Sequence, residues 1–203
     1  GRLSMAIDMF MGHYGRQFFN DLISSQVDMD RMDYLLRDSF YTGVIEGSVG
    51  SDRIISMLNI HNERLVIEEK GIYSIEKFLI ARRFMYWQVY MHKTVLAADQ
   101  MLKRIVRRAR HLTGSGSGVH STVPVDYFIR STVSRDGLLS GKHKDFIDMY
   151  FKLDDNELVA SIRQWAESDD PVLSDMARAF IFRRLPAIEL SDLPFESSRT
   201  AEQ

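Results

Sequence analysis

Apolar residues recur at intervals of three and four along most of this 203-residue chain, the spacing that places them on one face of a helix. The chain has only four prolines and they stand far apart, so long helices are permitted. We therefore predict an all-α fold, a multi-helix bundle. The segments with helical spacing are residues 3–10, 28–42, 52–58, 74–111, 124–134, 145–151, 155–168 and 172–184.

Two segments refine this picture. Residues 63–68 alternate enough to form one arm of a small β-hairpin, the only sheet that we expect. Residues 74–111 predict one continuous helix, about 57 Å long if it is unbroken. A helix of that length would pass through the core or form a subunit interface, with or without a bend.

A run of small residues divides the chain. The segment 113–118 reads Thr-Gly-Ser-Gly-Ser-Gly, which is the composition of a flexible linker. Beyond it, Asp154 and Asp170 stand where they would cap helices, and Trp165 falls on the apolar side of its helix. We predict a helical domain at residues 1–113, a linker at 114–118, a helical C-terminal subdomain at 119–190 and a polar, fraying tail at 191–203.

Composition limits the function classes. A net charge of −2 argues against a general nucleic-acid coat protein. No stretch reaches the roughly 18 apolar residues of a membrane span, so we expect no membrane partner. The chain has no cysteine, which excludes disulfides, thiolate metal sites and cysteine nucleophiles. Together with the lack of a secretion signal, this predicts a cytoplasmic protein.

The segment 28–42 concentrates charge on one predicted helix. Its period places Asp30, Tyr34 and Asp38 on one side, with Arg37 and Tyr41, and an apolar face on another side. Every charge also has a structural explanation, and spacing alone supports both interpretations equally. Asp28 would cap the helix, Asp30 would complement the helix dipole, and Asp33 and Arg37 would form a surface ion pair. The expected apolar face consists of Met29, Met32, Leu36 and Phe40.

The long helix carries two further groups of interest. Arg82, Tyr86, Tyr90 and Lys93 fall within a narrow arc that a polyanion could follow, or the tyrosines could belong to the core. Residues 103–111 hold five fixed positive charges without an acid. They could form an anion or nucleic-acid patch, but we favour compensation of the helix dipole, because the chain is slightly acidic overall.

Two motifs in this order resemble a known family. The run Val-Asp-Met-Asp-Arg-Met-Asp-Tyr at 27–34, followed by Arg37, Asp38 and Gly43, resembles the last metal-ligand helix of HD-domain phosphohydrolases. The run Arg-Arg-Phe-Met-Tyr-Trp-Gln-Val-Tyr-Met-His-Lys at 82–93 resembles the long helix that follows it. The resemblance is closest to the deoxynucleotide triphosphohydrolases, which include the SAM-and-HD-domain dNTPase and bacterial dGTPases, and it covers residues 26–102.

The resemblance implies roles for individual residues. Asp30 would be the last protein ligand of a divalent metal, which could be Mn, Fe, Mg or Zn. The implied substrate-binding residues are Arg31, Tyr34, Asp38, Arg82, Tyr86 and Tyr90, and His92 and Lys93 would contact a nucleotide effector. Arg31 replaces a lysine and Tyr86 a histidine of the eukaryotic enzyme, which leaves substrate choice open.

The ligand set of such a site is incomplete in this sequence. No His-Asp dipeptide occurs, and only His13 precedes the acidic helix. Carboxylate alone holds a divalent transition metal more weakly than imidazole and carboxylate together. We therefore expect no complete catalytic site here, and we expect residues 1–113 to be the C-terminal portion of an HD-type domain. The chain by itself would then be inactive and could lack the metal.

The resemblance implies that the intact protein hydrolyses a deoxynucleoside triphosphate to deoxynucleoside and triphosphate. Its partners would be a nucleotide substrate, a nucleotide effector and further copies of itself. Two alternatives stay open. The protein could be an HD phosphohydrolase of another nucleotide phosphoester, or a non-catalytic helical module for regulation or oligomerisation.

Overall fold

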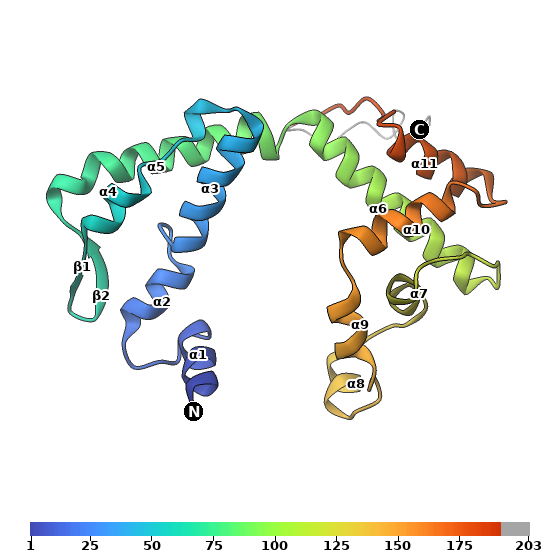
Figure 1. The fold of residues 1–203 in the computed structure, drawn as a ribbon, viewed down its shortest axis with the longest axis horizontal. Helices are drawn as coiled ribbons and strands as arrows, with labels where there is room; N and C mark the ends of the chain where they lie inside the picture. Colours follow the sequence, from blue (N-terminus) through green and yellow to red (C-terminus); the bar gives the residue numbers. More distant parts are fainter. Residues whose placement is uncertain (192–203) are drawn as a thin grey trace. The chain divides into compact units, whose positions relative to one another are not determined.

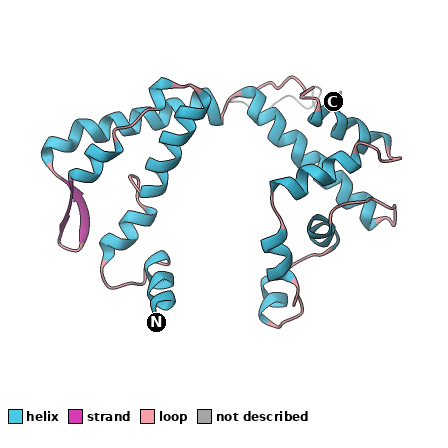
Figure 2. Cartoon of the chain, viewed as in Figure 1, coloured by secondary structure: helices cyan, strands magenta, loops and turns pink. Residues whose placement is uncertain are grey.

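The computed structural model describes residues 1–191 and divides the chain into two compact units, Gly1–His92 and Lys93–Gln203. Helices dominate both units, and the only strands of the described part form one hairpin (Figure 2). The first unit contains α1 (Arg2–Phe10), α2 (Gln17–Ser24), α3 (Met29–Thr42), η1 (Ile45–Gly47), α4 (Ser51–Ser56), β1 (Leu58–His61), β2 (Arg64–Ile67), η2 (Glu69–Gly71), α5 (Ile72–Met85) and η3 (Tyr86–Tyr90). The second contains α6 (Lys93–Gly114), α7 (Val123–Arg130), α8 (Arg135–Leu139), α9 (Phe146–Lys152), α10 (Asp155–Trp165) and α11 (Pro171–Ile181).

The predicted all-α fold with one small hairpin is confirmed. The strands pair antiparallel, with Leu58 opposite Ile67 and His61 opposite Arg64. Asn62 and Glu63 form the turn with φ of 49° and 61°, the left-handed geometry of a tight hairpin turn. The buried Asp21 carboxylate accepts hydrogen bonds from Arg64 Nε at 3.0 Å and from the Leu65 backbone N–H at 3.1 Å, which anchors the hairpin to α2.

Helix α3 begins and ends where the sequence predicts. Asp28 caps it by accepting the Arg31 backbone N–H at 2.8 Å, and Gly43 ends it with a φ of 72° that favours glycine. The predicted Asp33–Arg37 ion pair is present, at 3.1 Å. The boundaries of this helix therefore follow from local capping chemistry.

The predicted apolar face of α3 is partly wrong. Leu36 and Phe40 are 47% and 79% exposed, whereas Leu35 is fully buried and Ser39 nearly so. The buried side is turned toward η1, because the Ser39 hydroxyl donates to the Val44 carbonyl at 2.8 Å. A polar residue that satisfies a returning loop thus belongs to the core face, which apolar periodicity cannot reveal.

The first unit has its core where α3, α4 and α5 meet (Figure 1). Glycine at position 47 lets η1 approach α5, because a Cβ there would overlap the buried Met85 side chain and lie 3.1 Å from Ser39 Cβ. Helix α4 begins at Ser51, with Gly50 as its N-cap residue. The Ser51 hydroxyl is buried and has no hydrogen-bond partner among the described residues. The core side chains are Met32, Leu35, Val49, Ile54, Phe78, Ala81 and Met85.

The predicted continuous helix over residues 74–111 is wrong. Helix α5 ends at Met85, and the π-helical turn η3 follows, in which the Met91 N–H donates to the Tyr86 carbonyl at 2.8 Å. Helix α6 then begins at Lys93, where the second unit begins. Each helix buries its own face in its own unit, with the π-helical turn between them.

The second unit packs α11 and α7 against α6, and α10 packs on α11 and α7 (Figure 1). The predicted position of Trp165 is confirmed, since it is 1% exposed and its Nε1–H donates to Ser121 Oγ at 3.1 Å. Asp154 and Asp170 cap α10 and α11 as predicted. The four helices expected beyond residue 118 are present, three of them shorter than expected, and the sequence analysis missed α8. The helix α6 buries Ala97, Met101, Ile105, Ala109 and Leu112.

The segment 114–118 closes the end of α6 instead of separating the compact units. The Ser115 and Ser117 backbone N–H groups donate to carbonyls in the last turns of α6, and Gly116 has a φ of 83°. The units divide between His92 and Lys93, which differs from the division predicted at this segment. The predicted fraying tail lies outside the described residues, apart from Ser191.

Across residues 1–191, none of the helices combines the length and the apolar character that a bilayer span requires.

We expect Gly47→Ala to lower the free energy of unfolding by about 1–3 kcal/mol, because the new methyl group overpacks the contact with Met85. Gly15→Ala is the control, since a Cβ at position 15 meets nothing within 4 Å. Its effect should stay within about 0.5 kcal/mol. Urea denaturation of both variants measures the difference, and equal stability would contradict the close η1–α5 contact.

Candidate functional site

All six predicted substrate-binding residues belong to the first unit, and five of them form one cluster. Tyr34 and Asp38 come from α3, Arg82 from α5, and Tyr86 and Tyr90 from η3. The Tyr34 and Tyr90 ring centroids are 6.1 Å apart, and those of Tyr86 and Tyr90 are 5.3 Å apart, both edge to face. We call these five residues the tyrosine cluster.

One hydrogen bond joins the two sides of the tyrosine cluster. The Tyr90 hydroxyl donates to Asp38 Oδ2 at 2.7 Å, across 52 residues of sequence. Burial and this bond to the carboxylate raise the pKa of Tyr90 well above its usual range, and burial together with the neighbouring Tyr86 raises the pKa of Tyr34. Both phenols therefore stay neutral donors at physiological pH, beside an acceptor carboxylate.

Arg82 provides the positive charge of the cluster. Its guanidinium lies 5.7 Å from the Tyr86 ring centroid and donates to Gln26 Oε1 at 3.1 Å. A neutral amide partner leaves the guanidinium charge uncompensated, so it remains available to an anion. Gln26 was missed by the sequence analysis, and no local pattern could have identified a contact between residues so distant in the chain.

Arg31, the sixth predicted residue, is engaged with the start of its own helix. Its guanidinium donates to the Ser25 carbonyl at 2.7 Å and pairs with the Asp28 carboxylate, which is 2% exposed. Its guanidinium is therefore directed toward the helix start, and contact with substrate phosphate would require it to leave these partners. Arg31 follows the capping Asp28 by three residues, and this spacing in the sequence could have suggested the structural role.

Asp30 lies in the first turn of α3 and is exposed. No hydrogen bond or ion pair to this carboxylate occurs within residues 1–191, so it does not share the structural roles of Asp28 and Asp33. Asp30 could supply one oxygen ligand to a metal ion. The described part of the chain contains no group of three or more His, Asp or Glu side chains that could hold one. The residues present do not by themselves fit a metal site.

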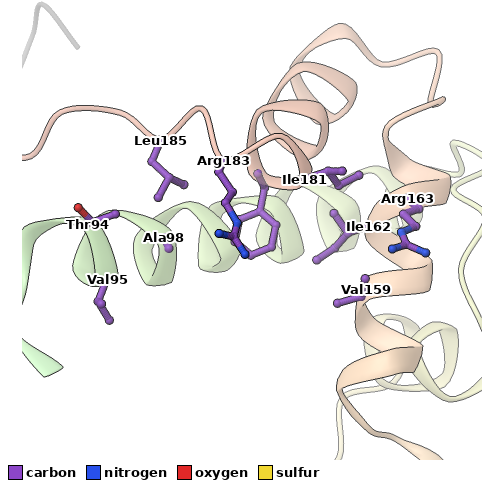
Figure 3. Close-up of a pocket in the computed structure, with 10 residues that line it drawn as sticks. Thr94, Val95, Ala98, Val159, Ile162, Arg163, Ile181, Arg183 and Leu185 are labelled. Atoms are coloured by element: carbon purple, nitrogen blue, oxygen red, sulfur yellow. The ribbon is translucent and has the colours of Figure 1, made fainter. Parts of the chain in front are cut away.

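His92 and Lys93, the predicted effector-binding residues, fall on either side of the division between the units. Lys93 is exposed at the start of α6. The next residues of α6 line an apolar pocket of about 550 Å³, to which α10, the end of α11 and the segment after α11 contribute (Figure 3). Two arginines, Arg163 and Arg183, also line it, and neither has an ion-pair partner within residues 1–191. The other lining residues are Thr94, Val95, Ala98, Val159, Ile162, Phe180, Ile181 and Leu185.

Three residues of the basic run at 103–111 make contacts within the second unit. Lys103 pairs with Asp99 at 2.6 Å within α6. Arg108 donates to both oxygens of the Asp170 cap, at 3.1 and 2.5 Å, and thereby joins α6 to α11. Arg110 donates to the Ser131 carbonyl at 3.2 Å. Two of the five fixed charges thus pair with carboxylates, whereas Arg104 and Arg107 have no ion-pair partner within residues 1–191. The anion patch and the compensation of the helix dipole both stay predictions.

Comparison with known proteins supports the HD-type part of the predicted resemblance. Residues 49–117 match the HD associated region family. A crystal structure of a phosphohydrolase, BT4208, from Bacteroides thetaiotaomicron superposes with a TM-score of 0.94 at 42% identity. It is matched over 100% of this chain and 50% of its own. The chain is thus linked to HD-type phosphohydrolases.

The other similar proteins are uncharacterized, so they add no activity to the comparison. The uncharacterized protein YwfO of Bacillus subtilis is 37% identical over 164 residues, which are 81% of this chain and 35% of YwfO. The uncharacterized protein MJ1154 of Methanocaldococcus jannaschii is 47% identical over 89 residues, 42% of this chain and 20% of MJ1154. A hypothetical protein from Aquifex aeolicus, with a TM-score of 0.50 at 24% identity, shares the fold. The chain spans half or less of the length of the relatives named here.

The raised pKa of Tyr90 predicts a loss of stability at high pH. The unfolded phenol ionises near pH 10, whereas the folded phenol stays protonated, so the free energy of unfolding falls as the pH rises above about 10. Tyr90→Phe should make this decline shallower, and Tyr41→Phe, at an exposed tyrosine, should leave it unchanged. Denaturation between pH 8 and 11 measures both slopes, and identical slopes would contradict a constrained Tyr90 hydroxyl.

Proposed function

We propose that this chain is the nucleotide-binding part of an HD-type phosphohydrolase, which hydrolyses a deoxynucleoside triphosphate to deoxynucleoside and triphosphate. The observation that carries the proposal is the Tyr90–Asp38 hydrogen bond within the tyrosine cluster. Asp38 lies on helix α3, which also carries the exposed Asp30. The similarity to the Bacteroides phosphohydrolase and the match to the HD associated region support the reaction class. The deoxynucleotide substrate rests on the sequence resemblance together with the chemistry of the cluster.

The tyrosine cluster suits a sugar that bears a triphosphate. A deoxyribose ring can pack on the faces of Tyr34 and Tyr90, and its hydroxyl can donate to the Asp38 carboxylate. A ribose 2′-hydroxyl against an aromatic ring would lose water without gaining a partner, a cost of about 1–3 kcal/mol. The Arg82 guanidinium supplies positive charge for phosphate oxygens. Apolar rings beside one acceptor and one cation therefore favour a deoxynucleotide.

The proposal assigns Asp30 as one ligand of a divalent metal, which would be Mn, Fe, Mg or Zn. The proposal takes its other ligands from polypeptide outside these residues, since the described part contains no group of three or more His, Asp or Glu side chains that could hold the ion. Support comes from the Bacteroides phosphohydrolase, of which this chain matches only half. A metal of this kind lowers the pKa of bound water.

We expect Asp30→Asn to abolish hydrolysis in the full-length protein while the fold is retained, because the variant loses one charged ligand. Asp33→Asn is the matched control, since Asp33 lies one turn away and pairs only with Arg37. The measurement is release of inorganic triphosphate, with circular dichroism as the test of folding. Full activity of Asp30→Asn would contradict the assignment of the site.

The first alternative is an HD phosphohydrolase of another nucleotide phosphoester. A panel of deoxynucleoside triphosphates, nucleoside monophosphates, guanosine polyphosphates and cyclic dinucleotides separates the two. Preferred turnover of any of the last three classes would replace the proposed substrate and retain the reaction class. The second alternative, a module without catalysis, predicts that the full-length protein holds no transition metal and behaves identically after Asp30→Asn.

A nucleotide effector is a second proposed ligand, and the pocket beside the start of α6 favours it. The pocket combines apolar walls for a base with Arg163 and Arg183 for phosphate. We expect Arg163→Gln to weaken activation by added nucleotide at least tenfold, and Arg178→Gln, on the neighbouring helix α11, to leave it unchanged. Equal activation of both variants, measured as turnover against effector concentration, would remove the pocket from consideration.

A further inference from the structure

The turn between α2 and α3 contacts the tyrosine cluster through one side chain, that of Gln26. Its Oε1 accepts the Arg82 Nη1–H at 3.1 Å, and Arg82 lies in the last turn of α5, 56 residues further along the chain. The Arg82 guanidinium also lies 5.7 Å from the Tyr86 ring centroid. An acceptor at one nitrogen and an aromatic ring nearby limit the orientations that this long side chain can adopt.

Hydrogen bonds hold the backbone on both sides of Gln26. The Val27 N–H donates to Ser25 Oγ at 3.3 Å, and the Ser25 carbonyl accepts from the Arg31 guanidinium at 2.7 Å. On the other side, Asp28 accepts the Arg31 backbone N–H at 2.8 Å as the cap of α3. A side chain can orient another one only if its own position is supported in this way.

The neutral charge of Gln26 decides what Arg82 can still bind. A guanidinium has five N–H donors, of which the amide oxygen takes one. Because the amide is uncharged, the contact sets a direction without offsetting the positive charge. Arg108 shows the opposite case, since it donates to both oxygens of the Asp170 carboxylate and joins two helices. A carboxylate at position 26 would likewise compensate the charge of Arg82.

We propose that Gln26 is a positioning residue, which directs the Arg82 guanidinium toward the phosphate oxygens of the ligand. This role rests on the proposed function, which assigns Arg82 to those phosphates. Gln26 acts through Arg82, and its requirement is an acceptor without charge. A negative charge at position 26 would strengthen the contact and weaken anion binding, so the effects on stability and on binding have opposite signs.

The variant Gln26→Glu tests these opposite signs in the 203-residue chain. We expect it to unfold at the same or a higher urea concentration than the parent, because the contact with Arg82 becomes an ion pair. Its affinity for inorganic triphosphate should fall at least tenfold. Gln100→Glu adds the same charge on α6, in the second unit, and should bind triphosphate like the parent. NMR of arginine-labelled chain follows binding at the Arg82 Nε–H signal, which Arg82→Lys assigns.

A second variant separates orientation from support of the fold. Gln26→Met has nearly the same length and no oxygen, so it loses the contact and leaves the Arg82 charge uncompensated. We expect its affinity for triphosphate to lie between those of the parent and Gln26→Glu, and its stability to be the lowest of the three. A purely structural role would make affinity follow stability instead.

Two results would overturn the role of Gln26: an affinity that follows stability across the three chains, or a parent chain whose Arg82 signal does not respond to triphosphate. Turnover by the full-length protein separates this role from the proposed function. Hydrolysis of a deoxynucleoside triphosphate with a KM that Gln26→Glu leaves unchanged would remove the positioning role and retain the reaction. Weaker triphosphate binding by Gln26→Glu, in a protein that hydrolyses no deoxynucleoside triphosphate, would retain the positioning role and remove the reaction.

Discussion

The packing of α3 against α5 is the contact on which the candidate site depends. Leu35 and Met85 are fully buried in this contact, and their sequence neighbours are Tyr34 and Tyr86. Since adjacent residues on a helix point about 100° apart, burying Leu35 and Met85 fixes the directions of both tyrosines. Glycine at position 47 allows the chain to pass close to Met85. The site is therefore positioned by the core and not by its own polar contacts.

The π-helical turn η3 completes this arrangement. It carries Tyr86 and Tyr90, and it ends where the first compact unit ends. A π-helical turn changes the register of side chains along a helix, and such turns are frequent at functional sites. Here Tyr90 reaches Asp38 on α3. The same interruption frees α6 to bury a separate face in the second unit.

Most charged residues of the first motif have structural duties, which makes the exceptions informative. Asp28 caps α3 and holds Arg31, and Asp33 pairs with Arg37. Within the described residues Asp30 has no such duty, and Arg82 has only a neutral partner. A guanidinium without an ion-pair partner, beside tyrosines of raised pKa, is an arrangement typical of functional sites.

Local chemistry made much of this predictable from sequence. The Asp28 cap, the Gly43 stop, the hairpin and the shared face of Tyr34 and Asp38 depend on residues within a few positions of one another. The failures concern contacts between distant segments. Ser39 joins the core because it bonds the returning loop at Val44. The predicted long helix is interrupted by the π-helical turn η3, and α5 and α6 contribute to separate cores. Such outcomes are decided by tertiary packing, which overrides periodicity.

The central claim is that the tyrosine cluster binds the sugar and phosphate of a nucleotide, and ring-specific NMR of the tyrosine-labelled chain tests it most directly. The chain has eight tyrosines, which single Tyr→Phe variants assign. The account predicts that at least one deoxynucleoside triphosphate, titrated to millimolar concentration, shifts the ring signals of Tyr34, Tyr86 and Tyr90. Absence of shifts for all four common deoxynucleotides, or shifts confined to the other five tyrosines, would contradict it.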